Sequence, residues 1–289
     1  MKLSVVIGTY NQKNVLKKAL ESLFHQTLSP ELYEIELIDS SSNDGTEKMV
    51  EELKPTCRFN YQRVANKGKT YARNLGIKAA RGEIIFLTDA DIIADRQLLA
   101  EHLQAHVKRT NAAFEGLEID TDGKPYIKAR LRPWQKLKWA YFLTGNLSIR
   151  KETILTAGLF DEQFQGYGWE DIELGYRLQQ MKVPLLYLPT AVNYHHHPVS
   201  REGILARKFE QGKSAALFYR KHPNFTIKMF IGINPLAMGI FHYLQKHPNL
   251  LAWLERKAPA SAFYEYLLEE YQYRLGLEQG LASSLPAGR

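Results

Sequence analysis

Short apolar segments alternate with helical patterns along the first third of the chain. Residues 3–7 are apolar at four of five positions, and the apolar residues from Val15 to Leu23 recur at helical spacing. Further strands are predicted at residues 34–38, 58–64 and 83–87, and further helices at about residues 46–53 and 68–80. Strands separated by helices of this length favour a mainly parallel sheet whose faces are covered by helices.

Polar residues follow three of these strands. They stand at Thr9-Tyr10-Asn11, at Asp39-Ser40 and at Asp89-Ala90-Asp91. In open α/β sheets, ligands bind beyond the carboxyl ends of the strands. The pattern therefore predicts that these three segments line one ligand crevice.

The pattern changes in the middle of the chain. Residues 113–119 and 125–131 are typical of a hairpin, and residues 141–150 of a further strand. A helix is predicted to begin at Trp169 or Glu170, and the sequence is helical in pattern from Arg201 onward. We therefore expect an α/β domain over residues 1–200 and a helical extension over residues 201–289.

Composition narrows the class of protein. The chain has 289 residues, of which 45% are hydrophobic and 24% charged, and this composition is typical of a globular protein. Its net charge of +7 is small for a nucleic-acid binder. Its one cysteine, Cys57, can form no internal disulfide, which indicates a reducing compartment. We find no signal-peptide pattern and no apolar run long enough to span a membrane. A cytoplasmic protein that binds phosphate-bearing ligands or an anionic membrane face fits these features.

Two pairs of aspartates have the spacing of a divalent-metal site. Asp89 and Asp91 follow a buried strand, and two carboxylates placed there can reach one Mg²⁺ or Mn²⁺ ion. The alternative for this pair is a solvated strand end or a helix cap. Asp120 and Asp122 precede Gly123, so a hairpin turn explains the second pair better.

Glu170 and Asp171 stand at the start of a predicted helix. Asp171 shares a helix face with Leu174 and Leu178, whereas Glu173 has the spacing for an ion pair with Arg177. The helix dipole stabilises an anionic side chain in the first turn, which would keep Asp171 available as a base. The alternative is an acidic cap without a catalytic role.

Histidines occur in two arrangements. In the run His195-His196-His197, alternate residues of a strand face the same way, so His195 and His197 are candidate metal ligands beside Asp91. The alternative is a solvated polar run. His102 and His106 are four residues apart on a predicted helix, and without a third ligand nearby we expect them on a solvated face.

Motifs of other enzyme classes are incomplete. Gly68-Lys69-Thr70 and Gly212-Lys213-Ser214 resemble the end of a phosphate-binding loop, but the required earlier glycines are replaced by Arg63 and Arg207. Neither the glycine-rich dinucleotide motif nor the serine-hydrolase motif occurs. Classical nucleoside triphosphatases, dinucleotide oxidoreductases and serine hydrolases are therefore excluded.

Six segments, taken together and in this order, resemble a known family. They are SVVIGTYN at residues 4–11, DSSSNDGT at 39–46, NKGKTYARNLG at 66–76, RGEIIFLTDAD at 81–91, GLFDEQF at 158–164 and GWEDIELGYRL at 168–178. The chain resembles a family-two glycosyltransferase with the GT-A fold, and the last segment is similar to the galactosyltransferase-like and chondroitin-polymerase-like branch. Gly8 departs from the proline that the family usually has, and Ser40 and Ser41 from its second acid or glycine.

The resemblance implies a nucleotide-binding half at residues 1–110 and an acceptor-binding and catalytic half at residues 111–200. Within the first half it implies a role for each of five side chains. Thr9, Tyr10 and Asp39 would hold the base, with Asp39 accepting a hydrogen bond from uracil. Arg73 would lie near the base or the diphosphate, and Asp89 near the ribose or the water shell of a metal ion.

For catalysis, the resemblance implies a divalent metal, Mn²⁺ or Mg²⁺, bound by Asp91 and by His195 or His197. Asp171 would be the catalytic base, and Glu170 would orient the acceptor sugar. Aromatic faces for a sugar ring would come from Tyr167 and Trp169, in a loop that Gly166 and Gly168 could hinge.

The function implied is an inverting hexosyl- or N-acetylhexosaminyltransferase that uses a nucleotide sugar, above all a UDP-sugar, and a glycan or lipid-linked acceptor, as in polysaccharide biosynthesis. A sugar-1-phosphate nucleotidyltransferase would need a glycine-rich basic loop, which Gly8–Gln12 is not. A carbohydrate-binding protein on the same fold would have no use for a metal site and a base in one crevice.

The C-terminal residues carry little of this resemblance. Residues 229–241 are apolar but interrupted by Asn234-Pro235, so we expect helix packing or a homodimer contact. The alternative is a peripheral contact with the inner face of the membrane, supported by nearby basic residues. These are Lys208, Lys213, Arg220, Lys221 and Lys228. Exposure of Met229, Phe230, Ile233 and Phe241 distinguishes the two.

Overall fold

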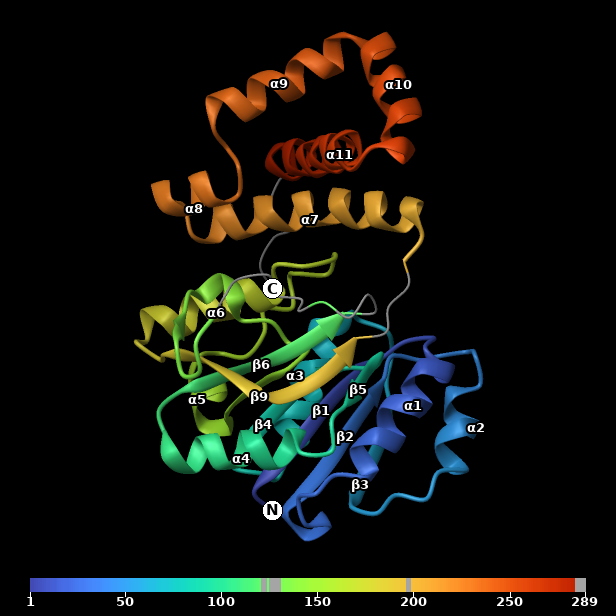
Figure 1. The fold of residues 1–289 in the computed structure, drawn as a ribbon, viewed down its shortest axis with the longest axis vertical. Coiled ribbons are helices and arrows are strands. Elements are labelled where there is room, and N and C mark those ends of the chain that lie inside the picture. Colours follow the sequence, from blue (N-terminus) through green and yellow to red (C-terminus); the bar gives the residue numbers. More distant parts are fainter. Residues whose placement is uncertain (121–123, 125–130, 196–198, 284–289) are drawn as a thin grey trace. The chain divides into compact units, whose positions relative to one another are not determined.

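The computed structural model describes residues 1–120, 124, 131–195 and 199–283. Its chain forms two compact units, residues 1–165 with 170–198 and residues 166–169 with 199–289. The first unit contains a sheet with helices around it, and the second consists of helices (Figure 1). The segment 125–130, within the predicted hairpin, and His197 lie outside the described residues.

The first four strands form the parallel part of the sheet, as predicted. They are β1 (Leu3–Thr9), β2 (Tyr33–Asp39), β3 (Arg58–Arg63) and β4 (Ile84–Asp89), in the order β3-β2-β1-β4. Because the strands are parallel, their carboxyl ends lie at one edge of the sheet. The polar residues that follow β1, β2 and β4 are therefore brought to that edge.

The second half of the sheet is mixed. It contains β5 (Ile92–Ala94), β6 (Ala113–Asp120), β7 (Lys136–Leu137), β8 (Leu147–Arg150) and β9 (Leu185–His195). From β4 the order continues β8-β6-β9-β5, with β6 and β9 parallel to each other and the other neighbours antiparallel. The predicted α/β class is confirmed, and the parallel arrangement is confined to the first four strands and the β6–β9 pair.

The strand predicted at residues 141–150 begins only at Leu147. Before it, the chain forms a loop in which the Gly145 carbonyl accepts hydrogen bonds from Thr88 Oγ1 at 3.0 Å and Asn193 Nδ2 at 2.8 Å. The Gly145 carbonyl oxygen therefore bonds to two side chains, whereas in a strand it would accept from the backbone N–H of a neighbouring strand. Sequence periodicity does not detect such side-chain contacts, which explains the error at the start of this strand.

Helices cover both faces of the sheet. In this unit they are α1 (Lys13–Phe24), α2 (Thr46–Glu51), α3 (Lys69–Ala79), α4 (Leu98–Lys108), α5 (Lys151–Thr156) and α6 (Glu170–Gln180). Leu3, Val5 and Ile7 of β1 pack in one apolar cluster with residues of α1 and α4, whereas Val6 packs in another with residues of α3 and α6. The alternation along β1 thus supplies two cores, one on each face.

The prediction that His102 and His106 lie on a solvated face is wrong. Both imidazoles are fully buried on α4, where they face polar residues of the loop before β8 and of β8 itself. His102 contacts Asn146 Oδ1 at 2.8 Å and Ser148 Oγ at 2.8 Å, and His106 Nε2 contacts the same hydroxyl at 2.9 Å. The spacing of four residues turns both rings toward the sheet, where Asn146 and Ser148 provide partners that the helix sequence alone does not reveal.

The second unit is helical, as predicted for the residues after 200. Its helices are α7 (Arg201–Lys221), α8 (Phe225–Phe230), α9 (Pro235–Lys246), α10 (Pro248–Lys257) and α11 (Ala262–Ala282). Short 3₁₀ helices lie at Pro30–Leu32 and Trp139–Tyr141 in the first unit and at Ala258–Ala260 in the second. Gly212 of α7 and Gly276 of α11 face the backbone of the other helix so closely that a Cβ at either position would collide with it. These glycines allow α7 and α11 to pack as the centre of the unit.

The four residues that distinguish helix packing from a membrane contact differ in their exposure. Phe241 is buried against Tyr271 of α11, with ring centroids 5.4 Å apart, which agrees with helix packing. Met229 and Phe230 are 44% and 49% exposed, and Ile233 is partly buried. Among the described residues, no helix is both long and apolar enough to cross a bilayer.

Candidate active site

The ends of β1 and β2 are joined by a network of short polar contacts. Asp39, fully buried, accepts hydrogen bonds from the Ser42 hydroxyl at 2.6 Å and the Tyr61 hydroxyl at 2.8 Å. Asn11 has a positive φ of 53°, and its backbone N–H donates to Ser42 Oγ at 2.9 Å. The two loops are therefore held together through Ser42, one of the serines that follow Asp39.

Two predicted base-binding residues lie beside this network. Tyr10 is 50% exposed. Thr9 is buried, and its hydroxyl has no hydrogen-bond partner among the described residues. A buried hydroxyl without a partner is costly, and a ligand that bonds to it would remove the cost. Asp39, by contrast, already has partners on both oxygens, so its predicted contact with uracil would add to existing bonds.

Arg73 connects three elements through its buried guanidinium. Located on α3, it donates to Asp89 Oδ1 at the end of β4 at 2.6 Å and to Glu170 Oε1 at the start of α6 at 3.2 Å. Lys69 adds a second cation, 3.2 Å from Asp89. Burial alone would raise the pKa of Asp89, but Lys69 and Arg73 outweigh this effect and hold that pKa well below its usual range. Asp89 is therefore a fixed anion in a cationic surrounding.

Asp91 and His195 are brought together by strand pairing. β5 runs antiparallel to β9, and Ile92 lies opposite His195. The Asp91 carboxylate lies 3.5 Å from Nε2 of His195, and Nδ1 donates to Glu118 Oε1 at 3.1 Å. Burial lowers the pKa of His195, but the two carboxylates outweigh burial and raise it to about 10.

The donor set fits a divalent ion in part. A carboxylate that accepts from one ring nitrogen of a histidine orients the other nitrogen toward a metal, and Glu118 stands in this position. Asp91 Oδ2 and His195 Nε2, which lie 3.5 Å apart, are the two atoms that would bind such an ion. The described residues contain no group of three His, Cys, Asp or Glu side chains able to hold a metal. The pairing of Asp91 with His195 agrees with the prediction, while the metal itself stays a prediction.

Asp171 lies in the first turn of α6, next to Glu170. Its Oδ1 accepts from the backbone N–H of Ile172 at 2.7 Å. Burial and the neighbouring charge of Glu170 together raise its pKa to about 7, although Arg73 and Lys69 act in the opposite direction. A carboxylate with this pKa is suited to accept a proton near neutral pH.

The two carboxylate oxygens of Glu170 differ in their hydrogen bonding. Oε1 accepts from Arg73, whereas the buried Oε2 has no hydrogen-bond partner among the described residues. Such an oxygen offers an acceptor position for the hydroxyl of a ligand. On the same helix, Glu173 binds Arg177 at 2.7 Å, which confirms the predicted ion pair.

Sequence reasoning missed two carboxylates of β6. Glu118 orients His195, and Glu115 is buried with a carboxylate oxygen 3.2 Å from the backbone N–H of Leu143. Burial raises the pKa of Glu115 well above its usual value, and the charges of Glu118 and Asp171 raise it further. Glu115 is thus within electrostatic range of both the His195 side and the Asp171 side of the site. The only sequence signal was two glutamates inside an otherwise apolar strand.

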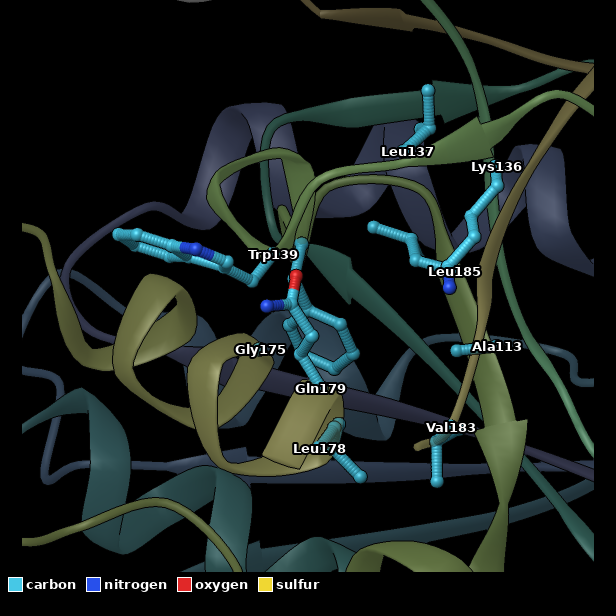
Figure 2. A pocket seen from close by; sticks show the side chains of 10 residues that line it. Ala113, Lys136, Leu137, Trp139, Gly175, Leu178, Gln179, Val183 and Leu185 are labelled. Carbon is cyan, nitrogen blue, oxygen red and sulfur yellow. The ribbon is translucent and has the colours of Figure 1, made fainter. Parts of the chain in front are cut away.

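The small pocket in Figure 2 is a different place. It is lined mainly by apolar side chains, with Trp139, Gly175 and Leu178 on one side and Leu137, Val183 and Leu185 on the other. None of the predicted site residues lines it. This pocket therefore belongs to the packing of α6 against the sheet.

The two predicted sugar-stacking residues belong to the second unit. Trp169 is buried, stacked on Phe218 with centroids 5.3 Å apart and in edge contact with Phe230. Tyr167 is 44% exposed, with the Arg207 guanidinium 4.8 Å from its ring centroid. The packing of Trp169 leaves little of its ring for a sugar, so Tyr167 is the better candidate of the two.

Comparisons with known proteins bear on this arrangement. The model of a family described as glycosyl transferase family 2 matches residues 4–158. The chain is 28% identical to the uncharacterized glycosyltransferase YfnE of Bacillus subtilis, over 71% of this chain and 67% of that protein. It is 24% identical to chondroitin synthase of Escherichia coli, over 78% of this chain and 39% of that protein. The match thus spans about two thirds of the first relative and a smaller part of the second.

Solved structures give the fold. The mannosyltransferase PcManGT from Pyrobaculum calidifontis, in complex with GDP-Man and Mn²⁺, superposes with a TM-score of 0.67 at 18% identity, over 97% of this chain and 86% of that chain. TarS 1–349 of Staphylococcus aureus in complex with UDP gives a TM-score of 0.60 at 18% identity, over 96% of this chain and 91% of that chain. The GT-A-like fold predicted from the sequence is confirmed.

Proposed function

The chain belongs to glycosyl transferase family 2, and we propose that it is a metal-dependent, inverting glycosyltransferase. It moves a hexosyl or N-acetylhexosaminyl group from a nucleotide sugar, most readily a UDP-sugar, to a hydroxyl group of a glycan or lipid-linked acceptor. The observation that carries the proposal is the pair of Asp91 and His195, on the same unit as Asp171 with its raised pKa. Contact of residues 201–289 with a membrane or a second copy of the chain belongs to the proposal as well.

The donor would bind at the carboxyl ends of β1, β2 and β4. Thr9 and Tyr10 would contact the base, and Asp39 would accept from it. The buried Thr9 hydroxyl, which has no hydrogen-bond partner in the part of the chain that the structure describes, is open to such a contact. Arg73 and Lys69 lie beside Asp89 and supply positive charge where a diphosphate brings negative charge. GDP-Man and UDP occur in the two structural neighbours, which supports a nucleotide-sugar donor in general.

Asp91, with His195 or His197, would hold Mn²⁺ or Mg²⁺, and Glu118 would orient His195. When bound, a divalent ion supplies Lewis-acid stabilisation of the charge that develops on the departing diphosphate. The protein's own part is to present His195 at the end of β9 and Asp91 directly before β5, the antiparallel neighbour of β9. It also places a fixed anion, Asp89, and its cationic partners beside them.

Proton transfer falls to Asp171. As the acceptor oxygen forms its bond to the anomeric carbon, the bond from that carbon to the diphosphate oxygen breaks, and the hydroxyl proton passes to the Asp171 carboxylate. Glu170 orients the acceptor through Oε2, which has no hydrogen-bond partner among the residues that the structure describes. General-base assistance of this kind contributes about 10²–10⁴-fold to a rate. Attack opposite the leaving group inverts the anomeric centre, and a single base suffices for it.

A screen of UDP-, GDP- and dTDP-sugars, with and without Mn²⁺, tests the proposal. We expect hydrolysis of one class of donor and a rise in melting temperature with it, both dependent on Mn²⁺. Equal signals with EDTA would contradict metal dependence. Formation of a nucleotide sugar from a sugar 1-phosphate and a nucleoside triphosphate would contradict the transferase proposal itself.

A further inference from the structure

The second unit exposes a stripe of large apolar side chains on α9. Leu236, Ile240 and Tyr243 are 76%, 52% and 55% exposed. Their spacing of four and three residues places them on one face of the helix. Single exposed apolar residues are normal on a protein surface, but three in register on one helix form a patch.

The opposite face of α9 contacts α11. Phe241 is buried against Tyr271 of α11, and His242 and Gln245 both contact Glu278 of α11, at 3.2 and 3.1 Å. These contacts fix the rotation of α9 about its axis. The stripe therefore points away from α11 and does not result from a loosely placed helix.

The chain around this helix is strongly basic. Between residues 220 and 257 it carries six Lys and Arg residues and one acid, Glu255, whereas the whole chain has a net charge of +7. The basic residues are Arg220, Lys221, Lys228, Lys246, Arg256 and Lys257. Most of the protein's excess positive charge thus lies in the segment that contains the apolar stripe.

We propose that this face of α9 binds the surface of an anionic phospholipid bilayer. An amphipathic helix in this mode lies in the plane of the interface, its apolar side chains among the acyl chains and its basic neighbours near the headgroups. Tyr243 suits the interfacial layer because its ring is apolar and its hydroxyl polar. Two partners are expected for residues 201–289, a membrane and a second copy of the chain. The charge favours the anionic membrane, because a second copy would bring two positively charged segments together.

Vesicle co-sedimentation tests the proposal. The probes are vesicles of phosphatidylcholine alone and of phosphatidylcholine mixed with phosphatidylglycerol. We expect binding to the mixed vesicles, and at least about a tenfold loss of binding in Leu236→Ser/Ile240→Ser, because two apolar side chains no longer enter the bilayer. Lys228→Glu/Lys246→Glu should weaken binding by at least about tenfold, and high salt should weaken that of the unmodified chain.

A matched control is Val107→Ser, which removes a 74% exposed apolar side chain from α4 in the first unit. It should leave vesicle binding unchanged. Since Leu236 and Ile240 are exposed, their double variant should melt at the same temperature as the unmodified chain. A lowered melting temperature would show a packing role and overturn the proposal.

Two other outcomes would also overturn it. One is equal binding to both vesicle types. The other is no binding to mixed vesicles, and self-association, measured by light scattering, that Leu236→Ser/Ile240→Ser abolishes would then assign the stripe to a dimer contact. The result is separable from the proposed transferase activity. Asp171→Asn should bind vesicles normally, and Leu236→Ser/Ile240→Ser should hydrolyse a nucleotide sugar normally when no vesicles are present.

Discussion

Two buried polar clusters of the first unit differ in how their hydrogen bonds are completed. In the cluster of His102 and His106, nearly every polar atom has a neutral partner within the protein. In the candidate site, charged groups prevail, and buried atoms of Thr9 and Glu170 have no hydrogen-bond partner among the described residues. A completed neutral cluster holds a fold together, whereas an incomplete charged one is prepared for a ligand.

The histidines of the two regions show the same contrast. Burial lowers the pKa of His102 to about 4 and that of His106 to about 3. The pKa of His195 is raised, because Asp91 and Glu118 outweigh burial. Substitutions in the candidate site should therefore change activity without changing stability, and substitutions in the histidine cluster should do the opposite.

The largest effect is expected from Asp171→Asn. An amide cannot accept the proton, so the rate of transfer should fall by about 10²–10⁴-fold, while UDP binding stays nearly intact. Glu152→Gln removes a carboxylate from the first turn of α5, where it is exposed, and should leave the rate unchanged. Steady-state kinetics and UDP titration measure both. Simultaneous loss of transfer and of UDP binding would assign Asp171 a structural role.

Glu118→Gln is expected to weaken binding of Mn²⁺ by about 10–100-fold, the usual effect of losing a carboxylate that orients a metal-bound histidine. Mn²⁺-dependent UDP binding should weaken with it, and the melting temperature without metal should change little. Asp91→Ala should weaken the same UDP binding at least as much, since it removes a proposed ligand. An unchanged affinity for UDP in the presence of Mn²⁺ would remove both residues from the metal site.

Within the histidine cluster, His102→Leu should be more destabilising than His106→Leu. Because the Asn146 amide oxygen only accepts, His102 Nε2 donates to it, and Nδ1 accepts from the Ser148 hydroxyl. His106 makes one bond, since its buried Nδ1 has no partner among the described residues. We expect losses of about 2–3 and about 1 kcal/mol in the free energy of unfolding, measured by denaturant titration. Donor hydrolysis per folded molecule should be unchanged, and a loss of it would contradict the separation of the two clusters.

Much of this arrangement could be predicted from the sequence, for a physical reason that also explains the failures. The parallel strands and the polar residues at their ends follow from periodicity and from the rule for parallel sheets, so Asp89 and Asp91 are predictable as candidates. Asp171 is a candidate for another reason, its place at the start of a predicted helix. The partners of a side chain follow from strand pairing instead. Glu118 reaches His195 only because β6 lies beside β9, and β5 brings Asp91 to the same ring.

The same limit explains why two histidines at helical spacing were placed on the wrong face. Burying a polar side chain is costly unless another segment of the chain supplies its hydrogen bonds. The sequence of a helix alone therefore favours a solvated face for its histidines. Ser148 and Asn146 are more than forty residues from His102 in sequence, so the α4 pattern contains no sign of them. Trp169 is a similar case, since its packing depends on Phe218 and Phe230.

A difference between two pH slopes is expected as well. The folded pKa values of His102 and His106, about 4 and about 3, lie below the ordinary value near 6.5, so below pH 6.5 the unfolded chain binds more protons than the folded one. Stability therefore falls as the pH is lowered from 6.5 toward 4, by about 1.4 kcal/mol per pH unit for each histidine. His106→Leu should remove one such contribution, so its stability should fall less steeply than that of the unmodified chain. Urea titrations at pH 6.5 and pH 5 measure the slopes, and equal slopes would mean that His106 is already charged in the folded protein.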